Sequence, residues 1–157
     1  MSLIFRLTYV FIISLFREKL PVGKSQSLLK LITLPNDLDL NMHMNNGRFL
    51  TICDLNRMDM FFRTGLAKVM LQKRWIPMVT EHTMVYMRPL KVFERFTVTA
   101  SLTHWDDKYF YMTHEFSKNN KMVATGTSKG LVRSKKGTIS PEEVIKAVNI
   151  SRQLTVA

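Results

Sequence analysis

Two kinds of hydrophobic spacing divide the chain into a helical first part and a strand-rich second part. Apolar side chains recur every three or four positions over residues 49–62. This spacing predicts one buried face of a long helix that begins at Asn45 or Asn46 and ends near Gly65. Apolar and polar residues instead alternate over residues 96–103, which predicts a strand with one face in a core.

Turn signals and shorter runs complete the set of predicted elements. Asn119-Asn120 is typical of a tight hairpin turn, and Ser140-Pro141 marks the start of a final helix. The order is a helix over 3–16, a strand over 27–34, the long helix with a helical stretch over 66–72, strands over 76–87, 96–103, 109–117 and 122–134, and the final helix. One long helix among antiparallel strands predicts an α+β fold in which a curved sheet wraps that helix. A sheet of this kind needs a partner for its free edge, so we expect an oligomer.

The length, net charge and cysteine content of the chain indicate what kind of protein it is and what kind of partner it binds. The chain has 157 residues, enough for one domain with a real core, and a net charge of +11 from 23 basic and 12 acidic residues. This excess favours an anionic partner such as a phosphate-bearing small ligand, nucleic acid or an anionic membrane. No short segment is densely basic, so the sequence gives no support to a nucleic-acid partner beyond net charge. The single cysteine, Cys53, excludes an intrachain disulfide and suits a reducing, cytoplasmic compartment.

The N-terminal segment is strongly apolar but short. Residues 3–16 contain one interruption, Arg6, and the run falls below the roughly 20 apolar residues of a membrane-spanning helix. Two interpretations remain for residues 1–22: a helix packed on the fold or on a second subunit, or an interfacial helix that makes peripheral membrane contact through residues 3–16. Residues 23–157 are then the main domain.

The candidate chemistry lies in the loop that precedes the long helix. Asp37, Asp39, His43, Asn45 and Asn46 follow one another there. The first backbone N–H groups of a helix have no partner within the helix and are able to hold an oxyanion. A carboxylate beside them acts as a base or a nucleophile, so the loop predicts a hydrolytic site, although an Asx residue at such a place also serves as a turn or cap.

Other polar residues carry weaker signals. The four histidines show no ligand spacing, so no metal site is expected, and Cys53 is interpreted as a small buried side chain. Glu81, on the predicted second strand, either faces the site as an auxiliary acid or faces solvent.

The loop and a second motif together resemble a known family. Asp37-x-Asp39-x-x-x-His43-x-Asn45-Asn46-x-x-Phe49 resembles the signature D-x-D-x-x-G-H-V-N-N-x-x-Y of hotdog-fold acyl-CoA thioesterases of the 4-hydroxybenzoyl-CoA thioesterase family. Tyr86-x-Arg88-Pro89-Leu90 is similar to the strand ending Y-x-R-P-L of the same family. The resemblance covers roughly residues 26–150 and is closest to the branch of thioesterase superfamily member six.

The resemblance implies a hotdog fold and a division of labour in thioester hydrolysis. Asp39 would be the catalytic carboxylate, as nucleophile or general base, and the backbone N–H near Asn46 would polarise the carbonyl oxygen. His43 and Asn45 would shape the loop, with His43 also near the substrate, while Asp37 would brace it. Met42, Asn45 and Phe49 would contact the substrate. Glu81 would also contact it if its side chain faces the site. The substrate would be a coenzyme A thioester, with no metal or redox cofactor, at the interface of a homodimer or homotetramer.

The chain departs from the family pattern at one position. Met42 occupies the place of the usual glycine, which permits a positive φ and a close approach of backbone to ligand. This departure, with the apolar N-terminal segment, keeps an alternative open: a non-catalytic acyl- or lipid-binding protein associated with membranes.

Overall fold

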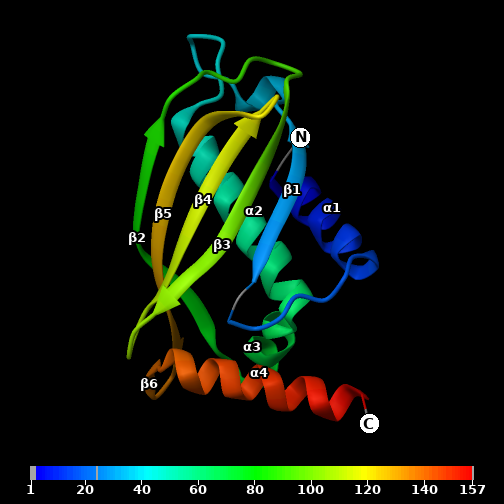
Figure 1. The fold of residues 1–157 in the computed structure, drawn as a ribbon, viewed down its shortest axis with the longest axis vertical. Coiled ribbons are helices and arrows are strands. Elements are labelled where there is room, and N and C mark those ends of the chain that lie inside the picture. The colour runs from blue at the N-terminus through cyan, green and yellow to red at the C-terminus, as the bar shows by residue number, and fades with distance from the viewer. Residues whose placement is uncertain (1–2, 24, 157) are drawn as a thin grey trace.

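Six strands and four α-helices make up the chain in the computed structural model, which describes residues 3–23 and 25–156 (Figure 1). Residues 1–2 of the predicted N-terminal segment, and residues 24 and 157 of the predicted main domain, lie outside the described residues. In chain order the elements are α1 (Leu3–Phe16), β1 (Gln26–Ile32), the short 3-10 helix η1 (Pro35–Asp37), α2 (Asn46–Thr64), α3 (Leu66–Lys73), β2 (Ile76–Tyr86), β3 (Arg95–Trp105), β4 (Phe110–Lys118), β5 (Lys121–Ser134), β6 (Gly137–Ile139) and α4 (Pro141–Val156).

The strands form one antiparallel sheet that curves around α2. Its order is β1-β3-β4-β5-β2, with β6 added to the end of β5. Figure 1 shows α2 lying in the concave face of this sheet, with α1 on the open side of α2 and α4 across one end. The predicted α+β arrangement, a curved sheet wrapped around one long helix with an extra N-terminal helix, is confirmed.

Local sequence sets both ends of α2. The side-chain oxygen of Asn45 accepts a hydrogen bond of 2.8 Å from the Gly47 N–H, which caps the first turn. Gly65 ends the helix with φ 87°, a left-handed angle that a side chain disfavours. Between these ends, Phe49 and Ile52 are buried in the core against the sheet. The predicted start and end of the long helix are therefore confirmed.

Turn chemistry explains the hairpin between β4 and β5. Asn119 and Asn120 have φ values of 48° and 60°, the pair of positive angles that a tight two-residue hairpin turn requires. The strand predicted over 27–34 ends earlier, at Ile32, because Pro35 opens η1 soon after it. The elements η1 and β6 were not predicted, since three residues are too few to show a periodic pattern.

The apolar N-terminal segment folds as α1 against α2 (Figure 1). Its inner face buries Arg6, Val10 and Ser14. Its outer face exposes large apolar side chains, among them Ile4, Phe5, Leu15 and Phe16. None of the helices within residues 3–23 and 25–156 has the length and apolarity needed to cross a membrane.

A buried carboxylate joins α2 to the segments on either side of it. Asp59 is fully buried and accepts a hydrogen bond of 2.6 Å from the Ser27 hydroxyl of β1. It also pairs with Arg17, after α1, at 3.1 Å and with Arg63 of α2 at 3.2 Å. Because a buried charge must be paired to be tolerated, these contacts fix the position of α2 in the sheet.

The strand β2 forms one edge of the sheet and is open along its length. It pairs only with β5 among the described strands, and nearly all of its eleven residues are exposed. The exposed side chains include Ile76, Met78, Val79 and Val85. A long, apolar and unprotected edge of this kind is a template for pairing with another chain.

Candidate active site

The loop before α2 is a small hairpin held by its own backbone. The Asp39 N–H donates to the His43 carbonyl at 2.9 Å, and the Met42 N–H donates to the Asp39 carbonyl at 3.0 Å. An isolated bridge joins Leu38 to Met44, and the Met44 N–H reaches the Leu90 carbonyl at 2.8 Å. These bonds fix the loop relative to the chain that follows β2.

Asp37 joins this hairpin to α1 and to the segment before η1. Its side chain is 1% exposed and accepts two hydrogen bonds from the Arg6 guanidinium of α1, at 3.0 and 2.5 Å, and one of 2.8 Å from the Leu34 N–H. Its own carbonyl accepts from the Asn45 N–H at 2.8 Å. Asp37 therefore braces the loop, in the role that the resemblance implied.

A cleft of about 280 Å³ opens at the N-terminus of α2. Asp39, His43, Asn46 and Phe49, four of the predicted site residues, line it together. The opposite wall comes from the end of β2 and the segment after it. The complete lining is Asp39, His43, Met44, Asn46, Phe49, Tyr86, Met87, Arg88, Pro89 and Leu90.

The polar groups in this cleft are suited to acyl transfer. One carboxylate oxygen of Asp39 accepts a hydrogen bond of 2.8 Å from the Asn41 N–H, and no described residue bonds to the other oxygen. The N–H of Asn46 belongs to the first turn of α2, and it too has no acceptor among the described residues. Asp39 and Asn46 thus line one cleft, with a carboxylate oxygen and a helix N-terminal N–H that have no partner among the described residues, and attack at a carbonyl requires this pair of groups.

The other predicted site residues lie elsewhere. Asn45 acts as the cap of α2. Met42 is 64% exposed and does not line the cleft, and its φ of 59° is the left-handed backbone conformation that a glycine adopts freely. Glu81 lies on β2 opposite Lys129, is exposed, and is not among the residues that line the cleft.

Six of the ten residues that line the cleft were not among the predicted site residues, and two of these six, Tyr86 and Arg88, add polar groups. The Tyr86 hydroxyl donates to the Asn46 carbonyl at 3.2 Å, and its ring packs against Phe49 with 5.2 Å between ring centroids. Arg88 brings a cation to the same wall and donates to the Met122 carbonyl. The signal for both was present in the Tyr86-x-Arg88-Pro89-Leu90 motif, which indicated the fold but carried no chemical role by itself.

A second, mostly apolar cavity of about 290 Å³ lies farther along α2. It lies between α2, α3, α4 and the sheet, and Met58, Phe61, Met70 and Met112 are among its lining residues. Arg57, Asp54 and Ser128 provide polar groups in its wall, and Pro77, Met78 and Val79 extend it to the edge strand β2.

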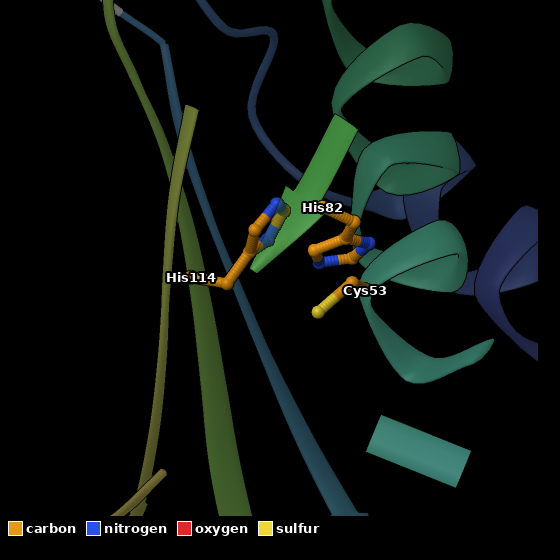
Figure 2. Close-up of side chains that lie close together, drawn as sticks. All are labelled: Cys53, His82 and His114. Carbon is orange, nitrogen blue, oxygen red and sulfur yellow. The ribbon is translucent and has the colours of Figure 1, made fainter. Parts of the chain in front are cut away.

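Between the cleft and this cavity lie the groups most able to bind a metal. Cys53, His82 and His114 come from α2, β2 and β4, and Figure 2 shows their side chains converging. Burial raises the pKa of the Cys53 thiol to about 12, and burial, followed by the charge of Arg57, lowers the pKa of His114 to about 3. Sequence spacing did not reveal this cluster, because its members lie far apart in the chain and only the fold brings them together.

Known proteins are similar to this chain in sequence and in fold. The chain is 39% identical over 85 residues to Protein THEM6 of Xenopus laevis, a match that covers 54% of this chain and 41% of that protein. The chain spans about half the length of the curated relatives it matches. Among solved structures, the probable thioesterase YbaW of Escherichia coli matches with a TM-score of 0.72 and 17% identity, over 78% of this chain and 96% of that one.

A protein crystallised with coenzyme A has the same fold. The hypothetical protein SAV2348 of Staphylococcus aureus, solved in complex with CoA, matches with a TM-score of 0.69 and 15% identity, over 83% of this chain and 85% of that one. The model of the thioesterase-like superfamily matches residues 33–151, which include the loop, α2 and every strand of the sheet except β1. The predicted hotdog fold and family are therefore confirmed, and the chain belongs to the thioesterase-like superfamily.

Proposed function

We propose that this chain hydrolyses the thioester bond of an acyl-CoA, with Asp39 as the reacting carboxylate. The observation that carries the proposal is that Asp39 and Asn46 line one cleft, where one carboxylate oxygen of Asp39 and the N–H of Asn46 have no partner among the described residues. Membership in the thioesterase-like superfamily supports the reaction class. The coenzyme A bound to a protein of the same fold supports the thiol portion of the substrate.

Two reaction routes are consistent with this cleft. In one, Asp39 takes a proton from water, and the water oxygen attacks the thioester carbonyl. In the other, the carboxylate attacks the carbonyl directly, and water then hydrolyses the mixed anhydride. In both routes the carbonyl oxygen gains negative charge that the Asn46 N–H stabilises, and the products are a free acid and coenzyme A. One such donor contributes roughly 2.7–4 kcal/mol in a measured oxyanion hole.

Substitution of Asp39 tests the proposal directly. Asp39→Asn keeps the size and the hydrogen bond to the Asn41 N–H but removes the negative charge, so we expect hydrolysis to fall by roughly 10²–10⁴-fold. The measurement is release of free thiol from acyl-CoAs of different chain length and type. Asp107→Asn, at an exposed turn residue, is the matched control and should keep the wild-type rate. Equal rates for wild type and Asp39→Asn would remove Asp39 from the mechanism.

We also propose that a second copy of the chain completes the cleft. The edge strand β2 exposes Ile76, Val79 and Val85, and its last residue, Tyr86, lines the cleft beside Asn46. Antiparallel pairing of two β2 strands about their centre would bring Tyr86 of one chain next to Ile76 of the other. The apolar cavity that reaches β2 at Pro77 and Met78 would then lie beside the other chain's cleft, where it suits an acyl chain.

The outer face of α1 favours a second candidate property, contact with an anionic membrane surface. Phe5 and Phe16 are 64% and 86% exposed, and the net charge of +11 would attract anionic lipids. The double substitution Phe5→Ser with Phe16→Ser should reduce co-sedimentation with phosphatidylserine-containing vesicles. Phe93→Ser is the control, since Phe93 is 63% exposed but lies outside α1. Equal sedimentation of all three proteins would exclude α1 as the contact.

A further inference from the structure

The strongest unassigned feature is the group of donor atoms formed by Cys53, His82 and His114. One donor atom from each residue lies within 4.8 Å of the other two, and both Cys53 and His114 are fully buried (Figure 2). Each residue comes from a different element, α2, β2 or β4, so the relative positions depend on the fold and not on one flexible segment. The cluster is separate from the Asp39 cleft, although Phe49 and Tyr86 of that cleft lie four residues before Cys53 and four after His82.

Two ring nitrogens in this cluster are buried without a hydrogen-bond partner in the described part of the chain. They are His82 Nε2 and His114 Nδ1. Buried polar atoms are almost always satisfied, so an unpaired pair beside a thiol indicates that another species belongs between them. A direct bond between the two rings does not account for them, because the ring centroids are 5.4 Å apart and no hydrogen bond joins them.

The surroundings of His114 allow its unpaired nitrogen to act as a ligand when a metal ion is present. Its other nitrogen, Nε2, lies 2.8 Å from the Ser128 hydroxyl, which is able to accept a hydrogen bond from an Nε2–H. Arg57 Nη1 lies 3.2 Å from the same Nε2 and is able only to donate, so without a metal Nε2 accepts and Nδ1 carries the proton. A metal ion that binds at Nδ1 displaces this proton, which moves to Nε2, and the Ser128 hydroxyl then accepts a hydrogen bond from Nε2–H. Outer contacts of this kind commonly set the tautomer of a metal-binding histidine.

One positive charge lies close to the cluster and is already paired. Arg57 Nη1 lies 3.2 Å from His114 Nε2 and 3.3 Å from the Ser128 hydroxyl, and the same guanidinium forms an ion pair with Asp54. The negative charge of Asp54 offsets the positive charge of Arg57, and a thiolate at Cys53 would add a second negative charge nearby. Arg57 therefore does not exclude a cation from the cluster.

We propose that Cys53, His82 and His114 form a binding site for Zn²⁺, with the Cys53 thiolate, His82 Nε2 and His114 Nδ1 as ligands. A thiolate with two imidazoles is a ligand set that zinc accepts, whereas Mg²⁺ and Ca²⁺ prefer oxygen. Since Zn–S and Zn–N bonds are about 2.3 and 2.0 Å, a shift of the side chains by about 1 Å brings all three atoms to bonding distance. On binding, the Cys53 thiol loses its proton to solvent, and a water molecule takes the fourth position. His82 is only partly buried at the edge strand, which gives the ion a route to the site.

The test measures zinc directly and does not depend on hydrolysis of any substrate. The full chain is treated with a chelator, equilibrated with Zn²⁺ and dialysed, and the retained metal is counted by mass spectrometry. We expect one zinc ion per chain in the wild type and a rise in Tm of several degrees with zinc. Because Cys53 is the only cysteine, Co²⁺ in place of Zn²⁺ should give a thiolate charge-transfer band in the near ultraviolet.

Variants separate this site from casual binding at surface histidines. Cys53→Ala should lose the retained zinc and the cobalt band, whereas His104→Ala, at an exposed histidine stacked on Tyr111, should keep both. Zinc retention by folded Cys53→Ala equal to that of wild type would overturn the proposal. If Cys53→Ala does not fold, the test uses the wild type only. A folded wild-type chain that shows no cobalt–thiolate band would overturn the proposal.

Discussion

The backbone angle of Met42 bears on the loop that carries Asp39. The chain places a methionine where the family signature has glycine, yet φ at this residue is 59°, in the left-handed region that glycine adopts freely. The side chain is 64% exposed and contributes little packing in return. The loop therefore keeps its conformation at a local cost of roughly 1–2 kcal/mol.

Restoring glycine at this position should stabilise the protein. Met42→Gly removes the strain but adds freedom to the unfolded chain, so we expect a net gain of about 0.5–1 kcal/mol in the free energy of unfolding. Urea denaturation at pH 7 measures it. Met42→Ala retains a Cβ atom and should show no such gain. If the glycine variant is no more stable than the alanine variant, the backbone at Met42 is not strained.

At the scale of elements, the exposed edge strand β2 is the reason to expect that the chain forms an oligomer. Its side chains Val79 and Val85 are exposed, and its outer backbone groups have no partner among the described strands. Only Glu81 places a full charge on the strand, so β2 has little of the protection that isolated edges usually have.

A charge added to β2 should therefore separate the subunits. We expect the wild type to sediment as a dimer or larger, and Val85→Lys to shift toward the monomer because a lysine ammonium would be forced into the pairing surface. Sedimentation velocity measures the shift. Leu71→Lys, at an 82% exposed position of α3, should leave the assembly unchanged. A monomeric wild type would refute pairing through β2.

The elements were predictable to the extent that their signals are local. The cap Asn45, the stop Gly65 and the turn Asn119-Asn120 each act on neighbouring backbone, so their positions follow from the sequence. The loop signature likewise located Asp39 and Asn46, which the fold brings into one cleft. Contacts between distant segments leave no such signal: the pairing of Arg6 with Asp37 spans 31 positions, and no periodicity indicates it.

At the scale of the whole molecule, the buried histidines make stability depend on pH. The pKa of His114 is lowered to about 3 by burial and by Arg57, and that of His82 is lowered for the same two reasons. The unfolded chain gains a proton at these residues below about pH 6.5, whereas folded His114 does not until about pH 3. Their neutral forms therefore favour folding fully above pH 6.5, and this contribution is lost as the pH falls from 6.5 toward 3.

We expect the metal-free protein to lose stability between pH 7 and pH 5, where most carboxylates remain ionised. The slope from His114 should approach about 1.4 kcal/mol per pH unit below the pKa of this residue in the unfolded chain. Urea denaturation with a chelator present measures this slope. His114→Gln should flatten it and His104→Gln should not. A slope that is the same in all three proteins would mean that His114 is protonated in the folded state.

The pairing of Arg6 of α1 with Asp37 of the loop matters for the design of shortened forms of this chain. Removal of α1, residues 3–16, looks harmless, because its outer face is apolar and none of its residues lines the Asp39 cleft. Yet this removal would take the Arg6 guanidinium away from the buried carboxylate of Asp37, which would keep only the longer ion pair of 3.6 Å with Arg48. The shortened protein should then lose the loop conformation that positions Asp39 while its sheet remains intact, so a lack of hydrolysis by such a preparation would not contradict the hydrolysis proposed for the untrimmed chain.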